Sequence, residues 1–355
     1  MPTEVSPTTA SSKPIDDRHP QQPSSTARQS APSDHRFSAG PLVSTTALLL
    51  WLAYLVIVIA LPQADLLRKE STTPVAVLAG TWLIALIAWT LTARVRPASP
   101  AARSLAHFLP WINATGAWFI VWQLTTSKLG LLTPPYFAAP EVLIASFLGD
   151  WRLLLSCLGA SALLFIIGYT AGSVLGFFTG LLMGWSRRAD YWLHPLLQTI
   201  GPVPAASLLP LALLLLPTTY ASAAFIVGFG AWFPMATMTR AGVRSVRRDY
   251  IDMARTLGAD ELFLIRRVAV PSALPDMLTG LFTGLGTSLA ALMTAELTGV
   301  DKGLAWYINW VKGWADYPRM YVGLIILVTF CRTLMVMLFK IRSSLLAWQQ
   351  NLVRW

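Results

Sequence analysis

Long runs of apolar residues recur along this chain, and they constrain its fold more than any other feature. A helix needs about 20 mostly apolar residues to cross the roughly 30 Å hydrocarbon core of a bilayer. Runs near that length or longer occur at 45–61, 74–93, 109–125, 153–185, 195–216, 220–238, 277–297 and 320–339. The chain is therefore predicted to be an all-α, polytopic membrane protein with about eight spanning helices.

The composition agrees with this fold class. Of the 355 residues, 55% are hydrophobic and only 12% are charged, whereas soluble domains carry roughly 25% charged residues. This balance excludes a freely soluble enzyme. The net charge of +10 is assigned to basic loops on the cytoplasmic side and to contact with membrane lipid, and not to a nucleic-acid surface.

The basic residues orient the predicted spans. They follow every second run, at Arg94, Arg96 and Arg103, at Arg187 and Arg188, across 240–267, and at Lys340 and Arg342. If each run crosses the membrane, all of these clusters lie on one side, and the excess of Lys and Arg in cytoplasmic loops makes that side the cytoplasm. Both termini are then cytoplasmic. Arg68 and Lys69, in the first outer loop, are the exception.

Several classes of chemistry have no support in the sequence. Cys157 and Cys331 lie inside apolar runs, so they predict neither a disulfide framework nor a metal centre. The four histidines have no second ligand at helical spacing. No Gly-Lys pair occurs, which excludes a phosphate-binding loop of the GxxxxGK type. We therefore predict no catalytic residue, no metal, no cofactor and no ATP hydrolysis by this chain.

The fourth run carries five glycines spaced by four residues. At 33 residues this run is about 50 Å long as a helix, so we expect its beginning, near Asp150, Trp151 and Arg152, to lie along the outer interface. The glycines, which share one helix face, are Gly168, Gly172, Gly176, Gly180 and Gly184. Such a ridge lets two membrane helices approach closely. We predict a packing surface, with sliding during a conformational cycle as a compatible alternative.

The run at 195–216 contains residues that disrupt a helix, namely Gly201, Pro202, Pro204 and Pro210. It should be kinked or locally unwound, and freed carbonyls at membrane depth are tolerated only inside protein or beside a water-filled path. A translocation path and a purely structural kink are the two interpretations. The candidate path residues are Gln198, Pro202, Pro204, Ser207 and Glu296. For Glu296, near the end of a late apolar run, solvation at the interface is the alternative.

The cytoplasmic loop at 240–276 is amphipathic. Seven arginines and five carboxylates alternate there with apolar residues, which predicts two short helices broken at Gly258 and stopped by Pro271 and Pro275 before the next span. The loop could be a solvated connector, a pair of surface-lying helices or a docking lever for a cytoplasmic partner.

The same loop resembles a known family. Asp252-Met253-Ala254, then Gly258, then Val268 and Pro271 resemble the EAA loop of ABC importer permeases. Segments 181–205, 232–246 and 295–308 resemble successive segments of the nitrate/sulfonate/taurine importer permeases, a bacterial inner-membrane group. The resemblance covers about 132–355.

That resemblance implies a type I permease core of about six helices at 105–355, in which the two extra helices at 41–104 have no counterpart. Residues 1–40 are rich in Pro, Ser, Thr and Gln, which predicts a disordered cytoplasmic tail. The resemblance also implies a homodimer, a periplasmic or lipid-anchored solute-binding protein, and a separate cytoplasmic ATPase that binds the ATP. The residues that would contact the ATPase are Asp252, Ala254, Arg255, Leu257, Gly258 and Ala259, with Pro271 completing the motif.

The function expected from the resemblance is import of a small solute, such as nitrate, a sulfonate or taurine. The anion preference comes from the family alone, because Arg332 is the one Lys or Arg placed deep in a predicted span. An uncharged or heterocyclic solute is the alternative. Asp252 and Met253 depart from the usual Glu and Ala. The alternative function is a membrane scaffold that binds a partner through its amphipathic loop.

Overall fold

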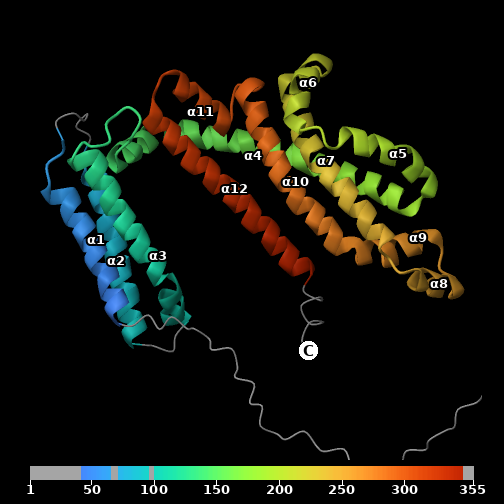
Figure 1. The fold of residues 1–355 in the computed structure, drawn as a ribbon, viewed down its shortest axis with the longest axis horizontal. Helices are drawn as coiled ribbons and strands as arrows, with labels where there is room; N and C mark the ends of the chain where they lie inside the picture. Colours follow the sequence, from blue (N-terminus) through green and yellow to red (C-terminus); the bar gives the residue numbers. More distant parts are fainter. Residues whose placement is uncertain (1–40, 65–70, 96–99, 347–355) are drawn as a thin grey trace, which may run out of the picture.

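A computed structural model describes residues 41–64, 71–95 and 100–346. The tail predicted to be disordered, together with Arg68, Lys69 and Arg96, lies outside the described residues. Throughout the described ranges, regular structure is helical (Figure 1). The helices are α1 (Pro41–Ala60), α2 (Thr73–Val95), α3 (Pro100–Gln123), α4 (Pro140–Trp185), α5 (Arg187–Ile200), α6 (Leu209–Leu215), α7 (Thr219–Arg244), α8 (Arg248–Thr256), α9 (Glu261–Phe263), α10 (Val270–Thr298), α11 (Leu304–Gly313) and α12 (Tyr317–Leu345). Short π-helical turns cover Leu124–Lys128 and Leu264–Ala269, and a 3-10 turn covers Ala205–Leu208.

The predicted class, an all-helical membrane protein, is confirmed. In the described part of the chain, six helices are long and apolar enough to cross a membrane, and a bent pair formed by α5 and α6 makes a seventh. Seven of the eight predicted runs fall on these segments. The run at 109–125 lies on α3 and the π turn that follows it.

The first three helices form a bundle of their own (Figure 1, blue to teal). Its core includes Trp51 and Tyr54 of α1, Leu86 of α2 and Leu109 of α3, and the Trp51 indole N–H donates to the Ile112 carbonyl at 3.2 Å. The boundary expected at 104 therefore falls inside a helix that packs with the two before it. Because α3 buries its apolar face against α1 and α2, this accessory part contains three helices.

The centre of the molecule is built from α4, α7 and α10. The 46 residues of α4 make one helix about 69 Å long, which begins at Pro140, before the expected 153. A core cluster joins Leu164 and Phe165 of α4, Ile226 of α7 and Leu292 of α10. Near the first third of α4, Asp150 accepts a hydrogen bond from Tyr307 of α11 (2.8 Å) and pairs with Arg319 of α12 (3.1 Å).

The loop at 240–276 is partly as expected. The predicted break at Gly258 is confirmed, since α8 ends there and a new helix begins at Glu261. The predicted stop at Pro271 and Pro275 is wrong, because residues 261–298 form one continuous helical segment. A π turn precedes Pro271 and the Val270 N–H donates to the Ile265 carbonyl, five residues back. This wider turn accommodates a residue without an amide hydrogen, so the helix continues.

Candidate functional site

All five glycines of the ridge on α4 face α7. A side-chain carbon added at Gly168, Gly176 or Gly180 would come within 2.5–2.7 Å of a backbone oxygen of α7, and one at Gly184 within 2.6 Å of Val243 Cβ. At Gly172 the added carbon would overlap the Gly228 backbone. The two helix backbones are therefore in direct contact along four turns, and this contact fixes α7 beside the bent helix pair.

The pair α5–α6 is bent by 91° at the glycine and proline cluster, so the predicted kink is confirmed. Pro202 and Pro204 lack amide hydrogens, and the helix resumes only through the 3-10 turn at Ala205–Leu208. The Phe233 ring of α7 rests against Gly201, where an added side chain would overlap the ring. The bend is thus held against α7 by an aromatic contact.

A cavity of about 380 Å³ lies at this bend, between residues 201–206, which connect α5 to α6, and the helices α7 and α10. It is lined by Gly201, Pro202, Val203, Pro204, Ala205, Ala206, Phe229, Gly230, Phe233, Pro234, Thr283, Thr287, Ala290, Ala291 and Thr294. None of these lining residues carries a charge. The cavity combines two aromatic rings of α7, one glycine and two prolines at the bend, and threonine hydroxyls from α10.

The structure brings only part of the predicted path set together. Pro202 and Pro204 line the cavity. Gln198 and Ser207 are exposed on the same helix pair but are outside the lining. Glu296 is 0% exposed, and its Oε2 accepts the Ala305 amide of α11 at 2.8 Å. In this conformation Glu296 therefore holds the first turn of α11, away from the cavity and from the solvent of the outer interface.

A stripe of hydroxyls was missed by sequence reasoning. Thr279, Thr283, Thr287, Thr294 and Thr298 recur on α10 at intervals of four and seven residues, and all are at least partly exposed. These intervals place them on one face of a helix, and polar side chains repeated along one face of an apolar helix could have identified it. Three of the five line the cavity.

The loop at 240–276 ends α8 with a defined turn. Gly258 has φ +85°; its amide donates to Arg255 O and the Ala259 amide donates to Ala254 O, both at 3.0 Å. This is a Schellman motif, which requires the left-handed conformation that glycine adopts readily. The Asp260 side chain then caps the next helix by accepting the Phe263 amide at 3.0 Å.

The turn exposes apolar side chains. Leu257 is 87% exposed and Met253 is 64% exposed. Asp252, Arg255 and Gly258 are exposed beside them, while Ala254 and Ala259 are half-buried. Pro271 lies apart from this group, in the first turn of α10. The structure therefore gathers six of the seven predicted coupling residues on α8 and the turn after it.

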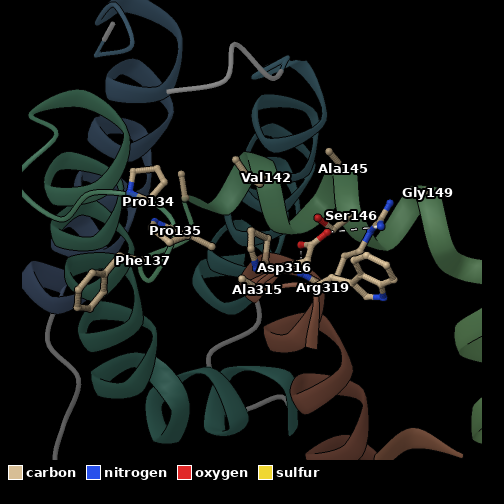
Figure 2. Close-up of a pocket in the computed structure, with 14 residues that line it drawn as sticks. Pro134, Pro135, Phe137, Val142, Ala145, Ser146, Gly149, Ala315, Asp316 and Arg319 are labelled. Atoms are coloured by element: carbon tan, nitrogen blue, oxygen red, sulfur yellow. Dashed lines mark hydrogen bonds and ion pairs between the residues drawn. The ribbon is translucent and has the colours of Figure 1, made fainter. Parts of the chain in front are cut away.

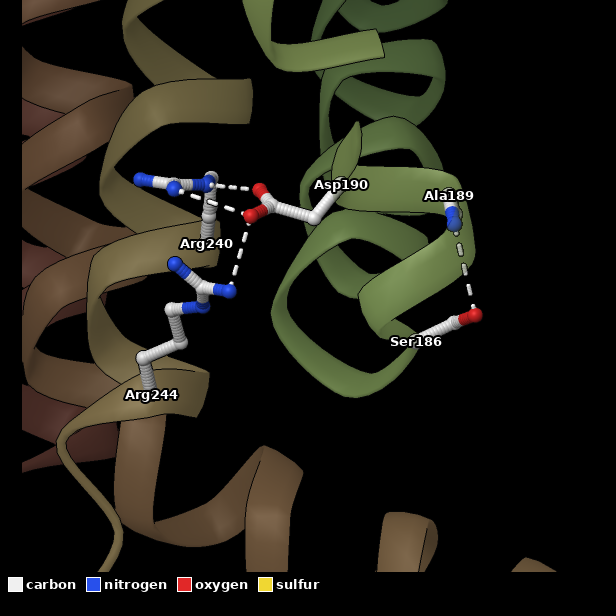
Figure 3. A network of polar contacts seen from close by, with 5 residues as sticks. All are labelled: Ser186, Ala189, Asp190, Arg240 and Arg244. Atoms are coloured by element: carbon white, nitrogen blue, oxygen red, sulfur yellow. Dashed lines mark hydrogen bonds and ion pairs between the residues drawn. The ribbon is translucent and has the colours of Figure 1, made fainter. Parts of the chain in front are cut away.

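An ion-pair cluster connects neighbouring elements beside this loop (Figure 3). Asp190 of α5 accepts hydrogen bonds from Arg240 Nε (2.6 Å) and Nη2 (3.3 Å) and from Arg244 Nη2 (2.8 Å) of α7. A cavity of about 640 Å³ next to it is lined by residues of α4, α5, α7 and α8, including Arg244 and Asp252. The cluster ties α5 to the end of α7 from which α8 follows. Sequence reasoning did not single out Asp190.

The opposite end of the molecule carries a second hollow, of about 580 Å³ (Figure 2). Pro134, Pro135 and Phe137 lie on one side of it, and Asp316 and Arg319 at the start of α12 lie on the other. Arg319 pairs with Asp316 at 3.4 Å as well as with Asp150. The arginine is thus neutralised by two carboxylates.

Known proteins of similar sequence are membrane components of transport systems. The family model described as "Binding-protein-dependent transport system inner membrane component" matches residues 172–346. The putative aliphatic sulfonates transport permease protein SsuC of Escherichia coli (strain K12) is 30% identical over 182 residues, which are 50% of this chain and 67% of SsuC. The formylaminopyrimidine transport permease protein ThiX of Halalkalibacterium halodurans is 27% identical over 157 residues, 44% of this chain and 62% of ThiX.

One further sequence match is shorter, and a further match is to a solved structure. The bicarbonate transport system permease protein CmpB of Synechococcus elongatus is 29% identical over 107 residues, 30% of this chain and 38% of CmpB. A crystal structure of an amino acid ABC transporter with histidines covers 58% of this chain and 97% of its own, with a TM-score of 0.47 and 17% identity. The family match includes the glycine ridge from Gly172, the bend, the cavity and the loop at 240–276. The chain belongs to the family of binding-protein-dependent transport system inner membrane components, the membrane permeases of ABC importers.

Proposed function

We propose that this chain forms half of a translocation path for a small solute and passes the movement of a separate ATPase to that path through α8 and the turn at Gly258. The solute belongs to the range that nitrate, sulfonate and taurine permeases and their relatives carry. The names of the relatives span anions, as in sulfonate and bicarbonate, and a pyrimidine. ATP binds to the partner ATPase, and a solute-binding protein delivers the solute on the outer side.

The observation that carries this proposal is the apolar surface of the coupling turn, which the rest of the chain leaves uncovered. Leu257, at 87% exposure, is held outward by the Schellman turn. An exposed leucine next to Met253 on a charged cytoplasmic loop suits insertion into a cleft of another protein. The ATPase is the occupant that the family membership supports.

The contacts around this turn connect it to several helices, as expected of an element that transmits movement. Arg255 pairs with Glu261 at 2.8 Å, and Glu261 also accepts the Trp185 indole N–H at 3.1 Å. Trp185 ends α4, whose glycine ridge packs on α7, and Asp190 ties α5 to α7. Displacement of the turn would therefore move α4, α5 and α7 together, and with them two walls of the cavity. ATP-driven closure of the ATPase shifts the population between outward and inward openings.

A second copy of the chain completes the proposed path. Leu211 and Leu214 of α6, the helix that follows the bend, are exposed, and a symmetric partner that covered them would close the cavity. Figure 1 shows α8, α9 and the end of α12 toward one side of the molecule and α6 and α11 toward the other. Arg94, Arg187 and Arg342 lie at helix ends on the α8 side, so we assign that side and both termini to the cytoplasm.

The test uses Leu257→Asp in the complex purified with its ATPase. Because Leu257 makes little contact within its own chain, the variant should insert and melt normally but lose ATPase co-purification or solute-stimulated ATP hydrolysis. Gly258→Pro, whose ring excludes a positive φ, should behave in the same way. Leu131→Asp, at a 70% exposed leucine on the outer side, is the matched control. Full coupling in both loop variants would reject the lever and favour a membrane scaffold.

A further inference from the structure

We infer that the solute crosses this path as an uncharged planar ring bearing N–H donors, such as an amino-substituted heterocycle, and not as an inorganic or sulfonate anion. This inference rests on the proposed function, because it takes the cavity at the α5–α6 bend as the path. It narrows the solute class that the family leaves broad.

The first argument is charge. None of the residues that line the cavity is ionisable. Among the described residues, Arg332 is the cation deepest in a candidate span, and it lies on α12 outside the lining. A second copy adds the same uncharged residues. An anion at membrane depth needs a cation or several aimed donors to replace its water, and the side chains here supply no cation.

The backbone at the bend also supplies few hydrogen-bond donors. Pro202 and Pro204 have no amide hydrogen. The Val203 amide donates to Ile200 O at 3.1 Å, and the Ser207 amide donates to Pro204 O at 2.9 Å. The turn that starts here therefore offers only the Ala205 and Ala206 amides as donors, whereas an ordinary helix start, which commonly binds anions, has four free amides.

The second argument is the direction of the hydroxyl groups. Thr287 donates its hydroxyl hydrogen to a backbone carbonyl, with Gly230 O at 2.6 Å, and Thr283 and Thr294 donate to Thr279 O and Ala290 O at 3.1 and 3.2 Å. A hydroxyl whose hydrogen is engaged still has lone pairs. The wall formed by α10 therefore offers acceptors, which select a solute with N–H or O–H donors and repel an anion.

The third argument is shape. Phe229 and Phe233 of α7 supply the aromatic part of the cavity wall, and the threonines come from α10. Phe229 continues into Trp232, with ring centroids 5.7 Å apart, and Phe233 is fixed against Gly201. Aromatic faces stack on planar rings. A volume of about 380 Å³ is within the range of small-ligand sites. A flat ring between the phenylalanines and the threonine oxygens satisfies both walls.

The test is uptake by the complete complex, co-purified from its native membrane and reconstituted in liposomes with ATP inside. The probes are cytosine, adenine and nicotinamide as uncharged rings, and nitrate and taurine as the alternative. At least one ring should accumulate and the two alternatives should not. Phe233→Leu and Thr287→Val should each lower uptake of that ring about threefold to tenfold. Phe225→Leu and Thr279→Val, on the same helices but outside the lining, should leave it unchanged.

The outcomes separate the two proposals. Uptake of nitrate or taurine with none of the rings would overturn the ring inference while leaving the importer intact. Failure of all three rings to accumulate overturns the ring inference as well, whether or not nitrate or taurine is taken up. Equal ring uptake in all four variants would show that the solute passes elsewhere. Loss of ATP-dependent uptake of every probe, with no ATPase in the purified complex, would instead reject the proposed function.

Discussion

At the scale of single residues, Glu296 shows how one buried carboxylate can serve structure. Its Oε2 accepts the Ala305 amide, and the neighbouring Leu304 amide donates to the Ser161 hydroxyl, both at 2.8 Å. These are the first amides of α11, which have no partner within their own helix. Gly303 permits the close approach, since a side chain there would collide with the carboxylate. Glu296 thus acts as the cap of α11.

We therefore predict that Glu296→Ala lowers the stability of the folded protein. The substitution leaves a buried amide without an acceptor, which costs about 1–3 kcal/mol. The measurement is thermal unfolding in detergent, where the melting temperature should fall. Asp301→Ala, at an exposed carboxylate five residues on, is the control and should melt normally. An unchanged melting temperature for Glu296→Ala together with lost uptake would instead support a role for Glu296 in the translocation path.

The sequence could show that Glu296 is an unusual ionisable residue in a span, but it could not show what the carboxylate contacts. Its partner, the Ala305 amide, belongs to the turn after the span. A carboxylate that faces water and a carboxylate that caps a short helix produce the same sequence pattern. The same holds for Asp190, whose two arginines lie 50 and 54 residues away.

At the scale of helices, the glycine ridge sets the distance between α4 and α7. We predict that Gly172→Ala destabilises the protein by about 1–3 kcal/mol, because overpacking at a close-packed contact forces the backbones apart. Gly159→Ala on the same helix, where nothing lies within 4 Å of the added carbon, controls for the change in helix propensity. Thermal unfolding in detergent measures both. If the two variants melt alike, α4 and α7 do not pack as described.

Apolar length predicted the elements well and their ends poorly. Burial in lipid requires apolar residues, so each span is visible in the sequence. The start of α4 at Pro140 and the existence of α11 depend on contacts between distant segments. The passage of the helix through Pro271 depends on the π turn that precedes it. The kink at Pro202 and Pro204 was predictable because proline acts on its own helix. The hydroxyl stripe on α10 was visible in the spacing but was not recognised.

At the scale of the whole molecule, the bundle α1–α3 meets the rest of the chain at a buried polar cluster around Glu141, in the first turn of α4. Glu141 is 3% exposed and accepts hydrogen bonds from Gln63 (3.2 Å), Gln123 (3.1 Å) and Ser127. Lys128 donates to the Val58 and Leu61 carbonyls at the end of α1, at 3.1 and 2.5 Å. These groups join α1, α3 and α4 far from the cavity at the bend.

This separation leads to a prediction about which parts of the molecule respond together. Glu141→Leu should speed amide hydrogen exchange in α1–α3, because Gln123 and Ser127, both 0% exposed, would lose their acceptor at about 1–3 kcal/mol each. Exchange in α7, α8 and α10 should stay unchanged, as should ATP-dependent uptake, since these helices meet α4 at Leu164 and beyond, far along the helix from Glu141. Hydrogen exchange with mass spectrometry in detergent measures this, with Thr179→Ala on α4 as the control. Faster exchange in α8 as well would mean that the bundle acts on the coupling turn, and would make it a regulator of transport.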